Sequence, residues 1–183
     1  TNSPAIRLIQ QDQRVTGAVP LVNGTEVTIH ATRGVVLASA GFPQDTARSA
    51  TKFPYNATHR SLAVPTATRD GLRMAEAVGA RQGEVASPSA WCPVSMVLWP
   101  DGREAPFPHM IERGKPGIIA VLPNEQRFCN EGLGYHDFVE SLLTSTPPGQ
   151  PPEAWLIATR AFQRRYGLGV SRPFPVPLRP WLR

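Results

Sequence analysis

The sequence predicts an α+β protein in which a β-meander and one buried strand precede a mixed region of helices and strands. Polar and apolar residues alternate near the N-terminus, which indicates strands with one solvent-exposed face. An uninterrupted apolar run at 34–38 is typical of a strand that is buried on both faces. Apolar residues then recur at helical spacing over 135–143, which predicts an amphipathic helix.

The N-terminal strands are predicted at 5–10 and 15–22, with a polar turn between them. Asn23-Gly24 follows as a two-residue hairpin turn, because both residue types tolerate the positive φ that this turn requires. The segment 26–30 alternates again and is expected to pair back on the second strand. These three segments form the predicted meander.

The buried strand at 34–38 ends in Ser39-Ala40-Gly41-Phe42, where small side chains let another group approach the backbone closely. A short helix is predicted near 44–49. A longer helix is predicted over 70–78, because an acidic residue at its start complements the helix dipole and Gly79 marks its end.

Proline accounts for 20 of the 183 residues, roughly twice the average share of about 5%. We therefore expect 83–123 to be irregular, apart from a strand at 118–121. After the amphipathic helix and a loop, a final helix is predicted over 153–166, with Trp155 and Phe162 on its apolar face.

Composition argues against several classes of protein. The net charge is +5, but the arginines are scattered and lack interleaved aromatic residues, so no nucleic-acid partner is expected. No apolar run approaches the roughly 18 residues of a membrane span. The two cysteines and four histidines show no metal-ligand or disulfide spacing. We expect a cytoplasmic protein without a metal, with Cys92 and Cys129 as buried thiols and the histidines in surface or loop positions.

The first motif combines Gly34-Val35-Val36-Leu37-Ala38-Ser39-Ala40-Gly41-Phe42 with Thr68-Arg69-Asp70-Gly71-Leu72-Arg73-Met74-Ala75. Alone, its first part indicates only a strand that leads into a loop. The ordered pair resembles the strand and helix that contact FAD in flavoproteins related to fumarate reductase and 3-ketosteroid dehydrogenase. This resemblance implies that Ser39, Ala40, Gly41 and Asp70 contact FAD.

Three residues replace glycines of the family pattern: Ala40, Arg69 before the aspartate, and Glu125 in the turn before the second motif. Next to Glu125, Asn124 is expected to take the left-handed conformation that the turn needs. Arg69 has three interpretations: a weakened FAD contact, a tilted loop, or a contact with the FAD pyrophosphate.

The second motif is Arg127-Phe128-Cys129-Asn130-Glu131, with Tyr135 four residues after the glutamate. The residues alone leave simpler alternatives open: a structural ion pair between Arg127 and Glu131, and a core position for Tyr135. The motif resembles the substrate side of the same family, in which fumarate reducers carry an arginine at this position and ketosteroid dehydrogenases a tyrosine. The resemblance implies that Tyr135 is catalytic and accepts a proton. Its place at a helix N-terminus favours the phenolate form.

Fumarate reducers also carry a histidine just after the FAD-contacting helix. The corresponding stretch here, Ser89-Ala90-Trp91-Cys92-Pro93, contains none. Without this histidine or the arginine, fumarate reduction is not expected. The apolar residues of the proline-rich region suggest either a wall of a substrate site or ordinary core: Trp91, Met96, Trp99 and Phe107.

The resemblance implies an FAD-dependent oxidoreductase acting on CH–CH groups. Such an enzyme introduces a double bond next to the ketone of a small apolar substrate such as a steroid, with the proton taken by Tyr135, the hydride by flavin N5, and the electrons passed to an external acceptor. Residues 1–85 would belong to the FAD-binding domain and 86–183 to a substrate-capping domain. The residues that bind the ketone are not identified by this resemblance.

Two alternatives stay open. One is a fumarate reductase-like flavoprotein that acts on another enone or organic acid. The other is a non-catalytic remnant that no longer binds FAD. The sequence contains no G-x-G-x-x-G loop to hold a pyrophosphate. The resemblance places that loop before Thr1, so we expect the 183-residue chain to be a fragment that is inactive by itself.

Overall fold

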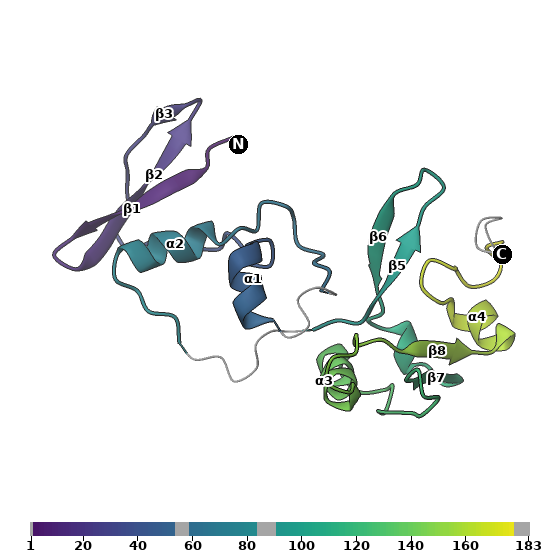
Figure 1. Ribbon diagram of the computed structural model, residues 1–183. Coiled ribbons are helices and arrows are strands. Elements are labelled where there is room, and N and C mark those ends of the chain that lie inside the picture. The colour runs from purple at the N-terminus through teal and green to yellow at the C-terminus, as the bar shows by residue number, and fades with distance from the viewer. Residues whose placement is uncertain (1, 54–58, 84–90, 178–183) are drawn as a thin grey trace. The chain divides into compact units, whose positions relative to one another are not determined.

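The computed structural model describes residues 2–53, 59–83 and 91–177, and it divides into two compact units (Figure 1). The first unit comprises Thr1–Pro54 and Ala63–Ala86, and the second comprises Tyr55–Leu62 and Ser87–Arg183. The domain boundary expected between residues 85 and 86 lies outside the described residues, as do Ser89 and Ala90.

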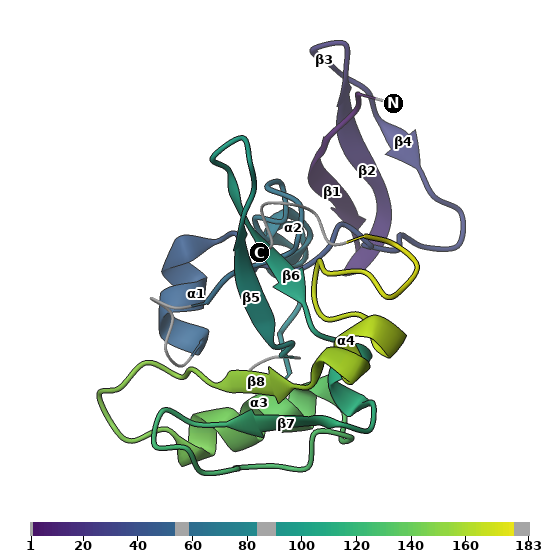
Figure 2. The same cartoon turned by 90° about the vertical axis from the view of Figure 1, so that its right-hand side faces the viewer.

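An antiparallel pair of strands forms the base of the first unit: β1 (Ala5–Gln11) and β2 (Arg14–Val22). Around the Asn23-Gly24 turn, the end of β2 pairs with the short strand β3 (Thr25–Glu26). The middle of β2 pairs with β4 (Ile29–His30), as Figure 2 shows. The predicted meander is confirmed, but its third segment consists of two short strands instead of one.

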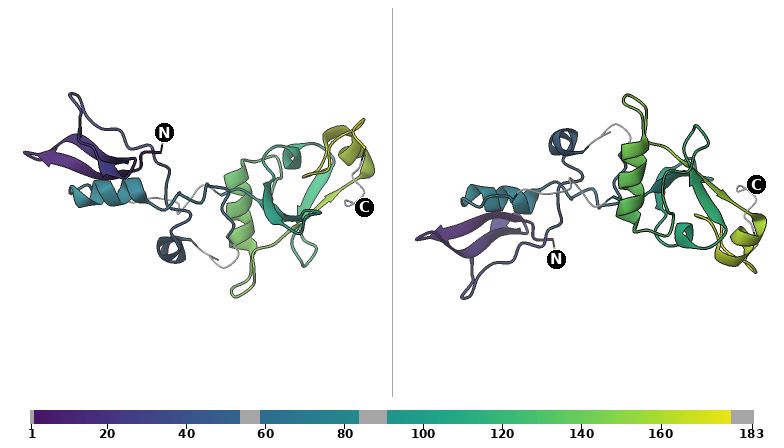
Figure 3. Two further views of the ribbon diagram at one scale, coloured as in Figure 1. Left: turned by 90° about the horizontal axis from the view of Figure 1, so that it is seen from above. Right: turned by 90° about the horizontal axis from the view of Figure 1, so that it is seen from below.

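Helices α1 (Thr46–Lys52) and α2 (Asp70–Ala77) complete the first unit. Helix α2 lies beside β1 and β2 (Figure 3), and the side-chain amide of Gln10 donates to the carbonyl of Val78 at 3.1 Å. Its buried Met74 joins a small apolar core in this unit. The other buried apolar residues there are Val19, Phe53 and Ala67.

The prediction of a buried strand at 34–38 is wrong. These residues form no strand, and Val36 is 89% exposed. A strand that is buried on both faces needs neighbouring strands in a sheet, and the described residues provide none for this segment. The apolar run at 34–38 is therefore a mostly exposed segment without regular structure, although its composition suggested a buried strand.

The second unit contains two separate antiparallel pairs. The first joins β5 (Val94–Leu98) to β6 (Glu104–Pro108). This pair lies in the region that we expected to be irregular, so that expectation is wrong here. Both strands are edges, and an edge strand tolerates prolines because it need not donate every backbone N–H.

The other pair joins β7 (Ile118–Val121), which matches the predicted strand, to β8 (Trp155–Ala158). We expected β8 to be the beginning of the final helix, and that prediction is wrong. The side chains of β8 alternate between exposed and half-buried, which is the period of a strand. The helix α4 (Arg160–Tyr166) begins only after Thr159, whose Oγ1 accepts from the N–H of Phe162 at 3.1 Å.

Helix α3 (Tyr135–Ser145) confirms the predicted amphipathic helix and lies beside the β7–β8 pair (Figure 1, Figure 2). Phe138 and Leu142 are its buried residues. A short 3-10 turn, η1 (Glu112–Gly114), precedes β7. The other buried apolar residues of this unit are Trp91, Ile118, Ala120, Val121, Leu122 and Phe162. In the described part of the chain, no helix has the length and apolar character needed to cross a membrane.

Candidate functional site

In the first unit, the predicted FAD-contacting residues lie in two segments that meet. The backbone N–H of Arg69 donates to the carbonyl of Gly41 at 3.1 Å. Ser39 packs so closely on the first turn of α2 that a methyl group at Gly71 would overlap its Oγ. The turn at 39–41 remains exposed, which leaves its backbone open to a bound group.

All three residues that replace family glycines take the left-handed backbone conformation, and two of them, Ala40 and Arg69, lie in the first unit. Ala40 has a φ of 62°, and Arg69, the residue before α2, has a φ of 76°. Glycine enters this region freely, whereas other residues do so at a cost of about 1–2 kcal/mol. The backbone path that glycine would favour is therefore kept at both positions.

The side chain of Arg69 has a partner within the unit. Its Nε lies 3.2 Å from Oδ2 of Asp45, and both side chains are largely buried. This ion pair favours the tilted-loop interpretation over a pyrophosphate contact, because the guanidinium already faces a carboxylate.

Asp70 begins α2 and has a side chain that is 51% exposed. Thr68 Oγ1 lies 3.4 Å from both carboxylate oxygens, and Arg73 forms an ion pair with Asp70 one turn further along the helix. These contacts hold the carboxylate at the helix N-terminus but leave half of its surface accessible. It can therefore still accept a hydrogen bond from a ligand.

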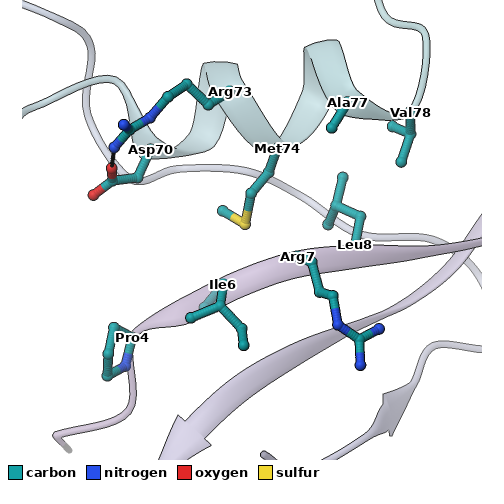
Figure 4. A pocket seen from close by; sticks show the side chains of 10 residues that line it. Pro4, Ile6, Arg7, Leu8, Asp70, Arg73, Met74, Ala77 and Val78 are labelled. Atoms are coloured by element: carbon teal, nitrogen blue, oxygen red, sulfur yellow. Dashed lines mark hydrogen bonds and ion pairs between the residues drawn. The ribbon is translucent and has the colours of Figure 1, made fainter.

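Asp70 also lines a cavity of about 500 Å³ between β1 and α2 (Figure 4). Asp70 and Arg73 lie at one end, and apolar side chains from both elements lie along it. Ser39, Ala40 and Gly41 do not line this cavity. Its other lining residues are Pro4, Ala5, Ile6, Arg7, Leu8, Met74, Ala77 and Val78.

The local geometry around Ser39 and Asp70 fits a dinucleotide cofactor. Exposed backbone with a left-handed residue, a helix N-terminus and an accessible carboxylate lie together in the first unit. Exposed turns and helix N-termini of this kind bind the polar parts of nucleotides. The geometry supports the predicted assignment of these residues, which stays a prediction.

In the second unit, Glu131 is the anchor of the second motif. It is 6% exposed. Arg127 donates to both of its carboxylate oxygens, with Nη2–Oε2 at 2.6 Å and Nε–Oε1 at 3.2 Å. The backbone N–H of Ala120 in β7 donates to Oε1 at 2.7 Å. The structural ion pair is therefore present within the loop, and the hydrogen bond from Ala120 to Glu131 attaches the 127–131 loop to β7.

The electrostatics of Glu131 follow from these contacts. Burial alone would raise the pKa of its carboxyl group. The hydrogen bonds from Arg127, from Ala120 and from its own backbone, together with the charge of Arg127, lower this pKa below its usual value. Glu131 is thus a fixed carboxylate with its hydrogen-bonding capacity largely used, which suits an anchor better than a catalytic base.

Tyr135 occupies the first position of α3 and is 40% exposed. It is the exception on the helix's apolar stripe, because Phe138 one turn later is 2% exposed. The alternative of a core tyrosine is wrong. Gly134 precedes the helix and supplies no side-chain cap, and the first turn carries Asp137, whose Oδ2 would lie 2.8 Å from a methyl group at Gly134.

The turn before Arg127 differs in one detail from its prediction. Glu125 takes the left-handed conformation with a φ of 66°, and Asn124, which we expected to do so, does not. The side chain of Asn124 instead accepts from the N–H of Gln126 at 3.1 Å. An asparagine that supports a turn in this way leaves the positive φ to its neighbour.

Sequence reasoning missed a cluster centred on His109, which we expected in a surface or loop position. This histidine is 5% exposed, with Nε2 at 2.7 Å from Oγ of Ser95 and Nδ1 at 2.6 Å from Oε1 of Glu112. The adjacent Arg113 is 2% exposed. No spacing signal predicts this cluster, because a hairpin brings Ser95 to His109.

The remaining candidates have structural surroundings. Nδ1 of His136 lies 3.2 Å from the N–H of Trp91, whose indole donates to Glu140 at 3.1 Å. Trp91 is therefore a buried residue against α3, whereas Met96 is 44% exposed. Cys92 and Cys129 are free and half-buried. Burial and the charge of Glu131 raise the pKa of Cys129 to about 11. Among the described residues, no three His, Cys, Asp or Glu side chains form a group suited to a metal ion.

Comparisons with known proteins agree with the family resemblance that the sequence shows. The model of the FAD binding domain family matches residues 1–168. Over 182 residues the chain is 35% identical to 4-oxocyclohex-2-ene-1-carboxylate 5-dehydrogenase of Sinomonas cyclohexanicum. The match covers 96% of this chain and 30% of that protein.

Solved structures show the same relationship. The 3-ketosteroid delta1-dehydrogenase from Sterolibacterium denitrificans, in complex with 1,4-androstadiene-3,17-dione, superposes with a TM-score of 0.74 and 29% identity. That match covers 96% of this chain and 32% of the other. A flavocytochrome c3 fumarate reductase shares the fold, with a TM-score of 0.52 and 24% identity over 89% of this chain and 27% of its own.

These matches define a flavoprotein class whose cofactor is FAD. The chain belongs to the FAD binding domain family. The predicted relationship to the 3-ketosteroid dehydrogenases is confirmed, and the fold is shared with a fumarate reductase. The chain spans about a third of the length of the relatives that it matches.

Proposed function

We propose that this chain is part of an FAD-dependent dehydrogenase that introduces a double bond next to a ketone, and that Tyr135 accepts the proton. The observation that carries the proposal is the setting of Tyr135. It is exposed at the N-terminus of α3, four residues after a glutamate whose carboxylate is held by Arg127 and by the backbone of β7.

The chemistry assigned to Tyr135 is a general-base step. A hydrogen on the carbon next to a carbonyl is acidic, and a positioned phenolate removes it as the double bond forms. FAD, when bound, supplies the acceptor for the hydride that leaves the neighbouring carbon. The electrons then pass to an external acceptor.

We assign FAD contact to Ser39, Ala40, Gly41 and Asp70. In this proposal residues 1–85 belong to the FAD-binding domain and 86–183 to the substrate-capping domain. The enzyme is located in the cytoplasm. The exposed turn at 39–41 and its contact with the start of α2 support the assignment.

Two substrate classes are compatible with Tyr135. A 3-ketosteroid-like substrate follows from the tyrosine and from the 3-ketosteroid dehydrogenase that superposes on 96% of this chain. A smaller cyclic oxo-carboxylate is favoured by the 35% identity to a 4-oxocyclohex-2-ene-1-carboxylate dehydrogenase. Both are cyclic ketones that lose hydrogen next to the carbonyl.

Turnover measurements on the FAD-loaded holoenzyme separate these classes. A 3-ketosteroid, 4-oxocyclohex-2-ene-1-carboxylate and fumarate would each be tested with an artificial electron acceptor or donor. We expect the ketosteroid to be oxidised and fumarate not to be reduced. Exclusive oxidation of the oxo-carboxylate would select the second class. Fumarate reduction, or a purified protein without flavin absorbance, would contradict the proposed function.

A further inference from the structure

We propose that Arg113 is a positioning residue for Tyr135, an inference that rests on the proposed role of Tyr135 as proton acceptor. Arg113 does not itself meet the substrate in this proposal. It fixes the backbone from which Tyr135 projects.

Arg113 connects three parts of the second unit. Its Nη1 donates to the carbonyl of Glu131 at 2.6 Å, and its Nε donates to the carbonyl of His109 at 3.0 Å. Its guanidinium carbon lies 5.1 Å from the centre of the Phe138 ring in α3. These contacts span η1, the loop before α3, and the first turns of α3 itself.

The His109 carbonyl is a rigid acceptor. The histidine ring is held by Ser95 on one side and by Glu112 on the other, and its backbone N–H donates to the carbonyl of Pro93 at 2.8 Å. The turn itself approaches the loop, since a methyl group at Gly114 would lie 3.7 Å from the Glu131 carbonyl oxygen. Because Arg113 bonds to this fixed carbonyl and to the carbonyl of Glu131, it holds the 127–131 loop in place.

Among the described residues, Arg113 forms no ion pair with a carboxylate, although it is 2% exposed. A buried charge is expensive unless its hydrogen-bonding groups are satisfied. Here two carbonyl oxygens and an aromatic face provide that compensation. Lysine would keep the charge, but its single ammonium cannot reproduce the planar fork that reaches two separate carbonyls.

In the sequence, Tyr135 lies between Glu131 and Phe138, the two residues that Arg113 contacts on either side of it. In the described part of the chain, the Tyr135 hydroxyl makes no hydrogen bond of its own to fix it. The location of the hydroxyl therefore depends on the backbone at the start of α3. A shift of about 1 Å in a catalytic group can lower turnover by about 10²-fold.

The test is a double-mutant cycle in the FAD-loaded holoenzyme, with Arg113→Lys made in both the wild-type and the Tyr135→Phe backgrounds. We expect Arg113→Lys alone to lower kcat for the ketone substrate by about 10-fold to 100-fold, with KM changed by less than about threefold. In the Tyr135→Phe background the same substitution should leave kcat nearly unchanged, because the group that it positions is gone.

Arg103→Lys is the matched control, since Arg103 also lies over an aromatic ring, Trp99, but is 69% exposed in the β5–β6 hairpin. It should leave kcat unchanged in both backgrounds. Equal losses from Arg113→Lys in both backgrounds, or no loss in the wild type, would overturn the inference while leaving the proposed function standing. Wild-type turnover in Tyr135→Phe alone would remove the proposed function, and the inference with it.

Discussion

Ser39 occupies the space that a side chain at Gly71 would need. A methyl group at Gly71 would overlap Ser39 Oγ, although it would lie 3.8 Å from Ser39 Cβ. The fit of this hydroxyl against this glycine packs the exposed turn on the start of α2, beside the backbone hydrogen bond from Arg69 to Gly41. This contact brings both halves of the predicted FAD-contacting motif to one place.

This fit predicts opposite effects of Gly71→Ala in two backgrounds. In the wild type, the substitution should lower the free energy of unfolding, because the new methyl group displaces the Ser39 side chain. In a Ser39→Ala background the overlap is absent, and alanine should stabilise the helix by up to about 1 kcal/mol relative to glycine. Urea unfolding of the four proteins measures both effects. The same sign in both backgrounds would show that the contact does not constrain the turn.

Asp70→Ala should separate FAD binding from helix stability. The carboxylate is half exposed, and as a first-turn acid it contributes at most about 1 kcal/mol to the helix. We expect the holoenzyme variant to lose flavin during gel filtration, with little change in the melting temperature of the apoprotein. Asp101→Ala, an exposed aspartate of the β5–β6 hairpin, is the control and should retain flavin. A large fall in melting temperature with flavin retained would make Asp70 a structural residue only.

Glu125→Gly should stabilise the protein. The residue has a φ of 66°, a conformation that disfavours a side chain by about 1–2 kcal/mol. Glycine removes this strain but adds about 0.5–1 kcal/mol of unfolded-state entropy, so a net gain of up to about 1.5 kcal/mol is expected. The neighbouring substitution Gln126→Gly, at a position without positive φ, should destabilise instead. Calorimetric melting of the two variants gives the comparison, and equal destabilisation would contradict the backbone assignment.

The pH dependence of stability should contain a contribution from Glu131. Its pKa is lower in the folded protein than the usual value of 4.5, so the ionised carboxylate stabilises the fold. That contribution is complete above the unfolded-state pKa and is lost as the pH falls through the lower folded value. Glu131→Gln should therefore be less stable near neutrality, and its stability should depend less on pH in the acid range below 4.5. Parallel curves for the variant and the wild type in urea titrations would argue against this assignment.

Local patterns were the most predictable part of this fold. The Asn23-Gly24 turn and the helix beginning at Tyr135 depend on adjacent residues and on helical periodicity, and both are found. The run at 34–38 and strand β8 were assigned wrongly, because their structure depends on whether a distant strand is available as a partner. The two prolines in β6 led to a prediction of irregular structure, although both strands of this hairpin are edges, where proline is tolerated.

In the candidate site too, local features were predictable from the sequence and contacts between distant segments were not. The motif around Arg127, Glu131 and Tyr135 is contiguous, so the sequence could indicate both the ion pair and the exposed helix start. Arg113 could not be found in this way, because its partners become neighbours only after folding. The positive φ of Ala40 and Arg69 likewise appears only in the backbone, although the replaced glycines of the family pattern mark both positions.

The most direct test of the account is the kcat of Tyr135→Phe in the FAD-loaded holoenzyme. The substitution removes one exposed oxygen and keeps the ring, so flavin content and melting temperature should match the wild type. If Tyr135 accepts the proton, kcat for the ketone substrate should fall by about 10²–10⁴-fold, with a much smaller change in KM. Turnover close to that of the wild type would show that another group takes the proton.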